Sequence, residues 1–278
     1  MMVDPLVNDL FTASQSETVP NLILVPTPLE LSHLMDFLPD SWAEHHLEIC
    51  GFGPIASAAR TSQLLGAQHY DRVFLVGIAG AYSSHGLTIG QAYLFQRVRC
   101  HGVGVGSGHN YQSAEELGWN HIDLGKLNQE QEEESQPLVQ PVGDLIDLSV
   151  PRTALKRTQT PEKELTDSRG LEATPVRELY QSGTLLTGCT ASADASEANQ
   201  RTRRYPDATA EDMEGFGVAL ACHLQSIPLT IIRGVSNTAG NRDHHQWQIP
   251  LAMKSVAELL FQVVAGCDTN SNPTRSVT

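Results

Sequence analysis

Positive charge is scarce in this chain. Its 278 residues include 18 Lys and Arg against 32 Asp and Glu, which gives a formal net charge of −14 and a pI of about 5.1. Proteins that bind nucleic acid or anionic membranes usually present a basic patch. The densest basic group here is Arg201, Arg203 and Arg204, at helical spacing. We therefore expect neither nucleic acid nor a membrane as a partner, and we favour a small molecule.

Cysteine pairs and long apolar runs are missing too. The five cysteines are scattered, and none forms a CxxC pair: Cys50, Cys100, Cys189, Cys222 and Cys267. Such a set is typical of a reduced, cytoplasmic protein. No run approaches the ~18 apolar residues that span a membrane, and the first residues lack the features of a signal peptide. We therefore expect a cytoplasmic protein.

The chain does have a regular alternation of apolar runs and helical patterns. Strands are predicted at 21–26, 46–50, 72–81, 91–100, 183–189, 208–214 and 229–236, and helices at 28–38, 55–67, 195–205, 215–226 and 250–264. This alternation is typical of α/β proteins with a largely parallel sheet. Apolar residues make up 40% of the chain, enough for a sizeable core. We expect one domain over 21–266, between a loose leader (1–20) and a polar tail (267–278).

A Glu- and Gln-rich stretch interrupts this alternation. Residues 125–144 read GKLNQEQEEESQPLVQPVGD, and the chain stays polar to about residue 180. Charge runs of this kind are usually solvated. We interpret 125–180 as a polar insertion in the domain, with a separate interaction arm as the alternative.

Residues 51–56 (GFGPIA) fit the G-x-G-x-x-A fingerprint of dinucleotide-binding proteins. Two features weaken the match. Pro54 removes one backbone N–H that a pyrophosphate would use, and Asp71 precedes the next predicted strand instead of ending it. A tight strand-to-helix turn is the better interpretation.

Two other motifs give weak signals. Residues 101–110 (HGVGVGSGHN) fit no phosphate-binding pattern, so an active-site loop and a plain connection both remain open. The acid and histidines at 243–245 lack the spacing of a metal site on a helix. We therefore expect no metal and no organic cofactor.

Polar side chains gather where the predicted strands end. Glu30 follows the first strand, residues 77–80 end the third, 212–214 end a later one, and Ser236-Asn237 end the last. Ligands of α/β sheets bind at the carboxyl ends of strands. Either acid alone could merely cap the helix it precedes. Together with the amide, the two acids predict one ligand-binding crevice.

These residues resemble the nucleoside phosphorylase and nucleosidase superfamily. The resemblance runs over most of the chain outside the insertion, through the Gly-Phe-Gly run at 51–53, VGIAGAY (76–82), LTIG (87–90), DMEGFGVALACH (212–223) and IIRGVSN (231–237). The ending VSNTAGNRDHHQWQIPLA (235–252) is similar to the futalosine hydrolases, a subfamily of the alternative menaquinone pathway. The resemblance implies a three-layer α/β/α sandwich with a mixed, largely parallel sheet, and a homo-oligomer.

The resemblance also implies roles for the acids. Glu30 would position and deprotonate an attacking water. Met213 and Glu214 would form a ribose clamp, in which Glu214 accepts hydrogen bonds from the sugar hydroxyls, and Asp212 beside them would also bind substrate. No Arg or Lys stands in 25–30 or 51–54 to bind phosphate, so hydrolysis is favoured over phosphorolysis.

Four further residues would contact the base and the substituent. Ala79 and Gly80 would form the wall beside sugar and base, and Asn237 would face the purine N7. Adenine-specific relatives carry Asp there, whereas an amide can donate to O6 and accept from a protonated N7, as hypoxanthine requires. Arg242 is expected to bind the benzoate of futalosine at the pocket mouth.

The expected function is therefore hydrolysis of futalosine to hypoxanthine. A methylthioadenosine or adenosylhomocysteine nucleosidase, an inosine phosphorylase and a nucleoside-binding module without catalysis remain alternatives.

Overall fold

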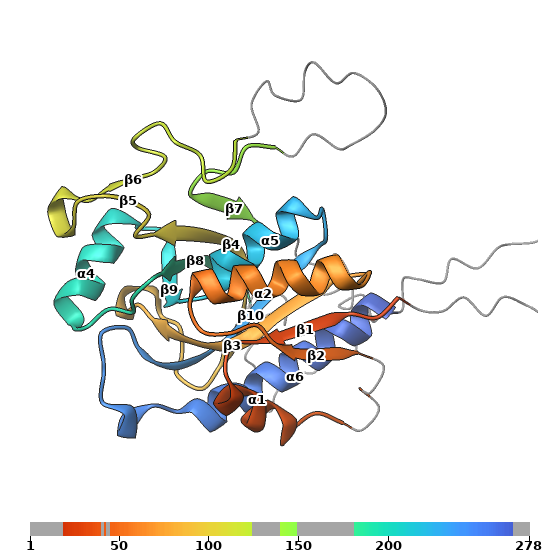
Figure 1. Ribbon diagram of the computed structural model, residues 1–278. Coiled ribbons are helices and arrows are strands. Elements are labelled where there is room, and N and C mark those ends of the chain that lie inside the picture. Colours follow the sequence, from red (N-terminus) through yellow and green to blue (C-terminus); the bar gives the residue numbers. More distant parts are fainter. Residues whose placement is uncertain (1–18, 40–41, 43–44, 124–139, 149–180, 269–278) are drawn as a thin grey trace, which may run out of the picture.

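The computed structural model describes residues 19–39, 42, 45–123, 140–148 and 181–268 (Figure 1). Within this part, a main sheet of eight strands runs in the order β10-β4-β8-β9-β3-β1-β2, and β7 pairs with β4. The strands are β1 (Leu22–Val25), β2 (His46–Ile49), β3 (Val73–Ala81), β4 (Ala92–His101), β7 (Leu145–Asp147), β8 (Gln181–Gly188), β9 (Ala208–Asp212) and β10 (Leu229–Thr238).

The sheet is mixed, and part of it closes on itself. Five pairs are parallel (β1–β2, β1–β3, β3–β10, β4–β8, β8–β9), and three are antiparallel (β4–β10, β3–β9, β4–β7). Because β10 pairs with both β3 and β4, the strands β3, β10, β4, β8 and β9 form a closed ring, and β1 and β2 extend from β3. The predicted mixed α/β sheet is present, but an open three-layer sandwich does not describe this closed barrel.

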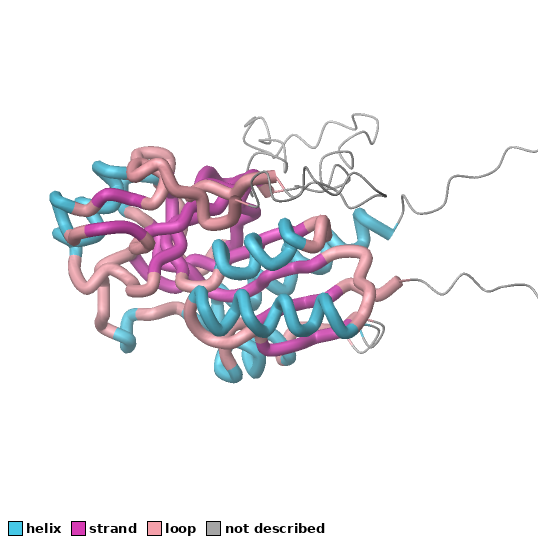
Figure 2. Tube along the Cα trace, turned by 45° about the horizontal axis from the view of Figure 1, so that its top comes forward, coloured by secondary structure: helices cyan, strands magenta, loops and turns pink. Residues whose placement is uncertain are grey.

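Helices cover both faces of the sheet (Figures 1 and 2). On one face lie α1 (Pro28–Met35) and α6 (Ile249–Asp268), and on the other lie α2 (Pro54–Ala67) and α5 (Gly215–Leu224). Side chains of a strand alternate between faces, so Ile23 packs with the α1 and α6 side while Leu24 packs with the α2 and α5 side. Strands covered on both faces read as continuous apolar runs, which is why β1 and most of β3 contain few polar residues.

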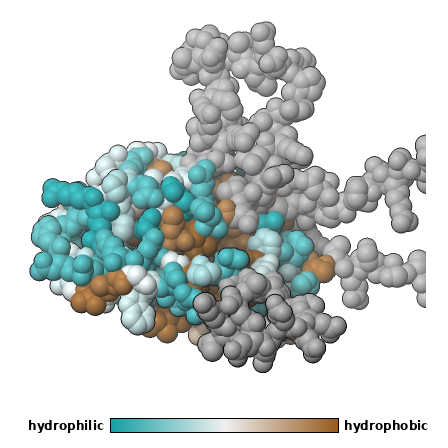
Figure 3. Space-filling model, turned by 90° about the horizontal axis from the view of Figure 1, so that it is seen from above, coloured by the Kyte–Doolittle hydropathy of each residue, from teal (hydrophilic) through white to brown (hydrophobic). Residues whose placement is uncertain are grey.

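Another helix, α4 (Ala195–Arg204), lies at one end of the molecule. Hydrophilic side chains gather at that end in Figure 3. Its inner face contributes Ala198 to a small third core with Tyr82 and Leu186. The same face buries Arg201, a charged residue inside the fold. No described helix is long and apolar enough to cross a membrane.

Short elements differ from expectation in two places. Inside the predicted insertion, β7 pairs with β4, so residues 145–147 belong to the sheet. The glycine-rich 101–110 run contains β5 (Gly104–Val105), which forms a two-stranded sheet with β6 (Gln112–Ser113). The leader, most of the insertion and the end of the tail lie outside the described residues.

Candidate active site

The carboxyl ends of β1, β3, β9 and β10 border a cavity of about 340 Å³. All residues predicted for the site line it. The lining includes Thr27, Glu30, Phe52, Ile78, Ala79, Gly80, Ala191, Glu211, Asp212, Met213, Glu214, Ser236, Asn237, Arg242, His244 and Trp247. The structure therefore brings the predicted residues to one place, and their individual roles remain predictions.

Glu30 is held at the cavity by the end of β1 and by β3. Thr27 caps α1 and accepts a hydrogen bond from the Glu30 N–H at 3.3 Å, which fixes the first turn. The Thr27 hydroxyl donates to Glu30 Oε2 (2.6 Å), and the Ile78 N–H donates to Oε1 (2.9 Å). Each carboxylate oxygen thus has one protein donor and keeps acceptor capacity for a ligand or water.

A buried guanidinium lies behind the predicted ribose clamp. Arg233 in β10 is fully buried, and its Nε (3.1 Å) and Nη2 (2.5 Å) both donate to Asp212 Oδ2. The Thr187 hydroxyl and the Gly215 N–H also donate to the Asp212 carboxylate (2.6 and 2.9 Å). The protein therefore supplies four hydrogen bonds to Asp212, a residue predicted to bind substrate, and this carboxylate orients Arg233.

One nitrogen of this guanidinium has no partner. Arg233 Nη1 is buried and makes no hydrogen bond to the described residues. It lies close to Gly77 and Glu30. A Cβ at Gly77 would be 2.3 Å from Nη1 and 2.7 Å from Glu30 Oε1. Glycine at this position therefore leaves the space in which the guanidinium and the carboxylate approach each other.

Glu214 is the second acid that faces the cavity. Its Oε1 accepts from the Gly53 N–H (3.0 Å), and its Oε2 accepts from Arg233 Nη2 (3.3 Å). Burial raises the pKa of Glu214 to about 7, against the lowering effect of Arg233, and the charges of Asp212 and Glu30 raise it further. The glycine-rich turn, with Gly51 and Gly53 at φ of +92° and +86°, therefore serves this carboxylate through its backbone N–H.

A β-bulge directs Asn237 towards the cavity. The register of β10 on β3 shifts between Val235 and Asn237. Asn237 Nδ2 donates to the carbonyls of Thr238 (2.9 Å) and Asn241 (3.3 Å), and Oδ1 accepts from the Ser236 hydroxyl (2.7 Å). Two carbonyl neighbours fix which end of the amide is nitrogen. The amide can therefore accept from a protonated N7, whereas the predicted donation to O6 would break one of these bonds.

A cationic and aromatic wall forms the outer part of the cavity. The Arg242 guanidinium lies 5.0 Å from the Trp247 ring centroid, and the His244 ring stacks on the same indole at 4.4 Å. Asp243 accepts from the backbone N–H of His245 and from Gln246 Nε2, so it closes a turn. Among the described residues, no ion pair joins Arg242 to an acid, and no cluster of His, Cys, Asp and Glu is arranged for a metal ion.

Sequence reasoning gave no role to Arg233 or to Glu211. A charge inside the apolar run LTIIRGVS was the signal for Arg233, because a charge in a buried strand needs buried partners. Glu211 precedes the predicted clamp, and its partners lie on α4 and the loop before it, which no local pattern reveals. The 101–110 run does not line the cavity.

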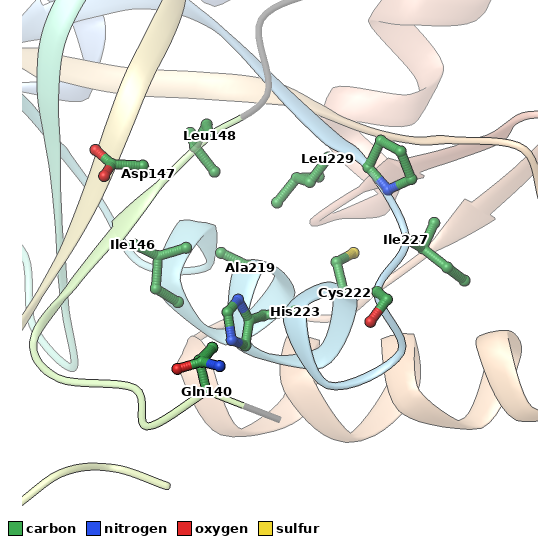
Figure 4. A pocket seen from close by; sticks show the side chains of 11 residues that line it. Gln140, Ile146, Asp147, Leu148, Ala219, Cys222, His223, Ile227 and Leu229 are labelled. Carbon is green, nitrogen blue, oxygen red and sulfur yellow. The ribbon is translucent and has the colours of Figure 1, made fainter. Parts of the chain in front are cut away.

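A second hollow of about 290 Å³ lies between β7, α5 and the start of β10 (Figure 4). Its titratable side chains are Asp147 and His223, with the thiol of Cys222. It lacks the convergent carboxylates and the buried cation of the first cavity. Convergent polar groups with perturbed pKa values mark functional sites, so the first cavity is the candidate active site.

Known proteins resemble this chain over most of its length. The family model described as "Phosphorylase superfamily" matches residues 44–265, which include every predicted site residue except Glu30. A futalosine hydrolase of Streptomyces coelicolor is 27% identical over 226 residues, covering 80% of this chain and 77% of that protein. A 5'-methylthioadenosine/S-adenosylhomocysteine nucleosidase of Chromohalobacter salexigens is 26% identical over 199 residues, covering 71% and 68%.

A solved structure of futalosine hydrolase from Helicobacter pylori superposes with a TM-score of 0.57 at 16% identity, covering 89% of this chain and 98% of that chain. At this identity the likeness shows a shared fold.

Proposed function

The chain belongs to the phosphorylase superfamily, and from this premise we propose that it is a nucleosidase that hydrolyses the N-glycosidic bond of futalosine and releases hypoxanthine. The observation that carries the proposal is the convergence of Glu30 and Glu214 on one cavity, in front of the buried Arg233 that lies close to both. Two similar curated proteins, a futalosine hydrolase and a methylthioadenosine/adenosylhomocysteine nucleosidase, support the reaction class.

The reaction needs a base and a stabilised cationic sugar. Cleavage of a glycosidic bond passes through a transition state with oxocarbenium character. Glu30 takes a proton from the attacking water, because it lines the cavity and its oxygens keep acceptor capacity. Glu214 accepts hydrogen bonds from the sugar hydroxyls and is oriented by Gly53 and Arg233.

Charge at the cavity supports water over phosphate as the nucleophile. The lining contains the four acids Glu30, Glu211, Asp212 and Glu214. The buried Arg233 behind them already donates hydrogen bonds to Asp212 and Glu214. Phosphate binding requires a surplus of donors and positive charge, so this floor would repel the anion. An inosine phosphorylase is therefore the weaker alternative.

Asn237 supports hypoxanthine as the leaving base. Negative charge flows into the purine as the bond breaks, and N7 takes a proton from solvent water, because an amide side chain has no acidic proton to give. Asn237 Oδ1 keeps one acceptor position for that N7–H, while its amide nitrogen is held by two carbonyls. An aspartic acid at this position could itself supply the proton, as the adenine-specific alternative requires. We therefore propose that Asn237 accepts the N7–H that hypoxanthine gains from solvent as it leaves.

The outer wall supports an aromatic carboxylate as the 5'-substituent. Arg242 and His244 lie against Trp247, so a benzoate could pair with the guanidinium and stack on the ring system. Replacement of Arg242 by Ala should raise KM for futalosine roughly tenfold, the effect of about 1.4 kcal/mol of lost binding. The KM for inosine should not change. Arg203→Ala, which removes an exposed cation from α4, is the matched control.

A panel of nucleosides tests the proposed substrate. The purified protein is incubated separately with futalosine, inosine and methylthioadenosine, and free base is detected by chromatography. We expect hypoxanthine from futalosine at the highest kcat/KM. Adenine from methylthioadenosine at comparable efficiency would contradict the role given to Asn237.

A further inference from the structure

A second buried ion pair lies next to the cavity. Arg201 on α4 and Glu211 at the end of β9 are 4% and 5% exposed, and Arg201 Nη1 donates to Glu211 Oε2 at 3.0 Å. Glu211 lines the cavity, whereas the guanidinium lies behind it. The proposed reaction uses neither residue. A buried ion pair is weak evidence for stability, because desolvation offsets much of its attraction, so its partners indicate what it does.

Most of the remaining partners belong to one loop. Residues 189–194 connect β8 to α4. Glu211 Oε1 accepts from the Ser192 N–H (2.8 Å), and Oε2 accepts from the Ser192 hydroxyl (2.6 Å). Arg201 donates to the Thr190 carbonyl (2.9 Å) and to the Thr190 hydroxyl (3.2 Å). The ion pair therefore holds the loop at alternate residues, on either side of Ala191.

Ala191 is the residue of this loop that lines the cavity. Its neighbours turn towards the ion pair, and Ser192 is fully buried, so its hydroxyl cannot touch a ligand. The loop also packs closely against the segment that follows Asn237. A Cβ at Gly240 would lie 2.4 Å from the carbonyl oxygen of Asp194. The wall at Ala191 is thus fixed from the β9 side and from the β10 side.

Strand register places the residue that holds this loop, Glu211, level with Asn237. Gly80 on β3 pairs with Glu211 on β9, and on its other side with Asn237 on β10. Glu211 and Asn237 therefore lie at one level of the barrel, on strands that flank Gly80. In the proposed function, the base contacts Asn237. The loop held by Glu211 lines the same cavity through Ala191, so it borders the space for the base.

We propose that Arg201 and Glu211 are positioning residues that fix the 189–194 loop and so set the affinity of the cavity for the purine base. The inference rests on the proposed function for the identity of the ligand. The pair does not touch the reacting atoms. It acts through Thr190 and Ser192 on the position of Ala191.

The test separates loop positioning from simple stabilisation. Ser192→Ala removes the hydrogen bond that the loop donates to Glu211 Oε2. Thr190→Val removes the hydroxyl that accepts from Arg201, and Thr190 is exposed, so folding is not at risk. Tyr82→Phe is the matched control, because the Tyr82 hydroxyl donates to the same Glu211 oxygen (3.0 Å) from outside the loop. For all three variants and the wild type, hypoxanthine Kd is measured by calorimetry, futalosine kcat and KM by base release, and Tm by melting.

We expect Ser192→Ala and Thr190→Val to weaken hypoxanthine binding and raise KM by roughly tenfold, or about 1.4 kcal/mol. Their kcat should change by less than about threefold, and Tyr82→Phe should leave Kd and KM unchanged although its Tm falls. Equal effects in all three variants, or no effect on Kd in the loop variants, would overturn the inference.

The two proposals fail in different ways. A wild-type protein that binds hypoxanthine but releases none from futalosine would overturn the proposed reaction, and the Kd values would still decide the role of the loop. A wild-type protein that does not bind hypoxanthine would overturn both.

Discussion

At the scale of single residues, three carboxylates share one guanidinium. Glu30, Asp212 and Glu214 all act on Arg233 electrostatically, and Asp212 takes most of its hydrogen bonds. Three negative charges around one positive charge cannot all be equally favourable in a buried site. Glu214 has the raised pKa because it is buried and its single contact with Arg233 is long. In the proposed mechanism, Asp212 orients the cation, Glu214 binds the sugar and Glu30 acts as the general base.

Loss of the Glu30 carboxylate, the proposed general base, should reduce turnover more than it weakens binding. Glu30→Gln keeps the shape, and its amide oxygen can still accept from the Ile78 N–H while its amide nitrogen donates to the Thr27 hydroxyl, but the proton acceptor is lost. We expect kcat for futalosine to fall at least ~100-fold, the usual scale for loss of a general base, with hypoxanthine Kd little changed. Glu48→Gln, at a half-exposed carboxylate paired with Arg60, is the control. Wild-type turnover in Glu30→Gln would show that another group activates the water.

The raised pKa of Glu214 predicts the acid limb of the pH profile. The carboxyl must be ionised to accept from two sugar hydroxyls, and its pKa is about 7. The value of kcat/KM should therefore fall as pH drops below about 7, and Glu214→Gln should be far less active and lack this limb. A profile that stays flat down to pH 5 would contradict the assignment.

The same shift affects stability. Between its ordinary pKa of 4.5 and about 7, folded Glu214 holds a proton that the unfolded chain has released. The free energy of unfolding contributed by this group therefore decreases as pH rises through that window. Relative to Glu214→Gln, the wild type should lose stability in urea titrations from pH 4.5 to 7. An increase over that range would show that the pKa is lowered instead.

At the scale of elements, the sequence predicted most of the strands and helices that border the site. Apolar runs bounded by Gly and Pro located β1, β3 and β10, because strands covered on both faces must be apolar. Closure of the barrel was not predictable, since it depends on β10 pairing with two strands that are far from it in sequence. The strand β7 was missed because only Leu145, Ile146 and Asp147 form it, within a polar stretch.

The candidate site was predictable only in part. Glu30, Glu214 and Asn237 stand at strand ends, where a sequence pattern can place them. Asp212 accepts hydrogen bonds from Thr187 and Arg233. The Asn237 amide donates to a carbonyl of the loop after β10. Such partners depend on tertiary packing, so neither periodicity nor motif spacing could show them.

Glycine in the middle of β3 should be essential for the site. Gly77→Ala places a Cβ too close to Arg233 Nη1, Glu30 Oε1 and the Pro26 ring. We expect kcat/KM to fall by at least tenfold and the free energy of unfolding to fall by about 1–3 kcal/mol, the usual cost of overpacking. Gly66→Ala, in the last turn of α2 with open space around it, is the control and should not reduce activity. Full activity in Gly77→Ala would contradict the close approach of the Arg233 guanidinium and the Glu30 carboxylate.

At the scale of the whole molecule, both the chain and the lining of the cavity are acidic. The chain carries a net charge of −14, and the cavity lining contains four carboxylates against one arginine, Arg242. A neutral sugar with an attached base suits such a site better than an inorganic anion. The homo-oligomer and the single domain over 21–266 remain predictions, and most of the 125–180 stretch lies outside the described residues.

The proposed nucleophile is water, activated by Glu30. The most direct measurement is the rate of hypoxanthine release from futalosine in phosphate-free buffer, and again with phosphate added at constant ionic strength. We predict equal rates in the two buffers, with dehypoxanthine futalosine as the other product. Release that requires phosphate and yields a sugar phosphate would contradict the account.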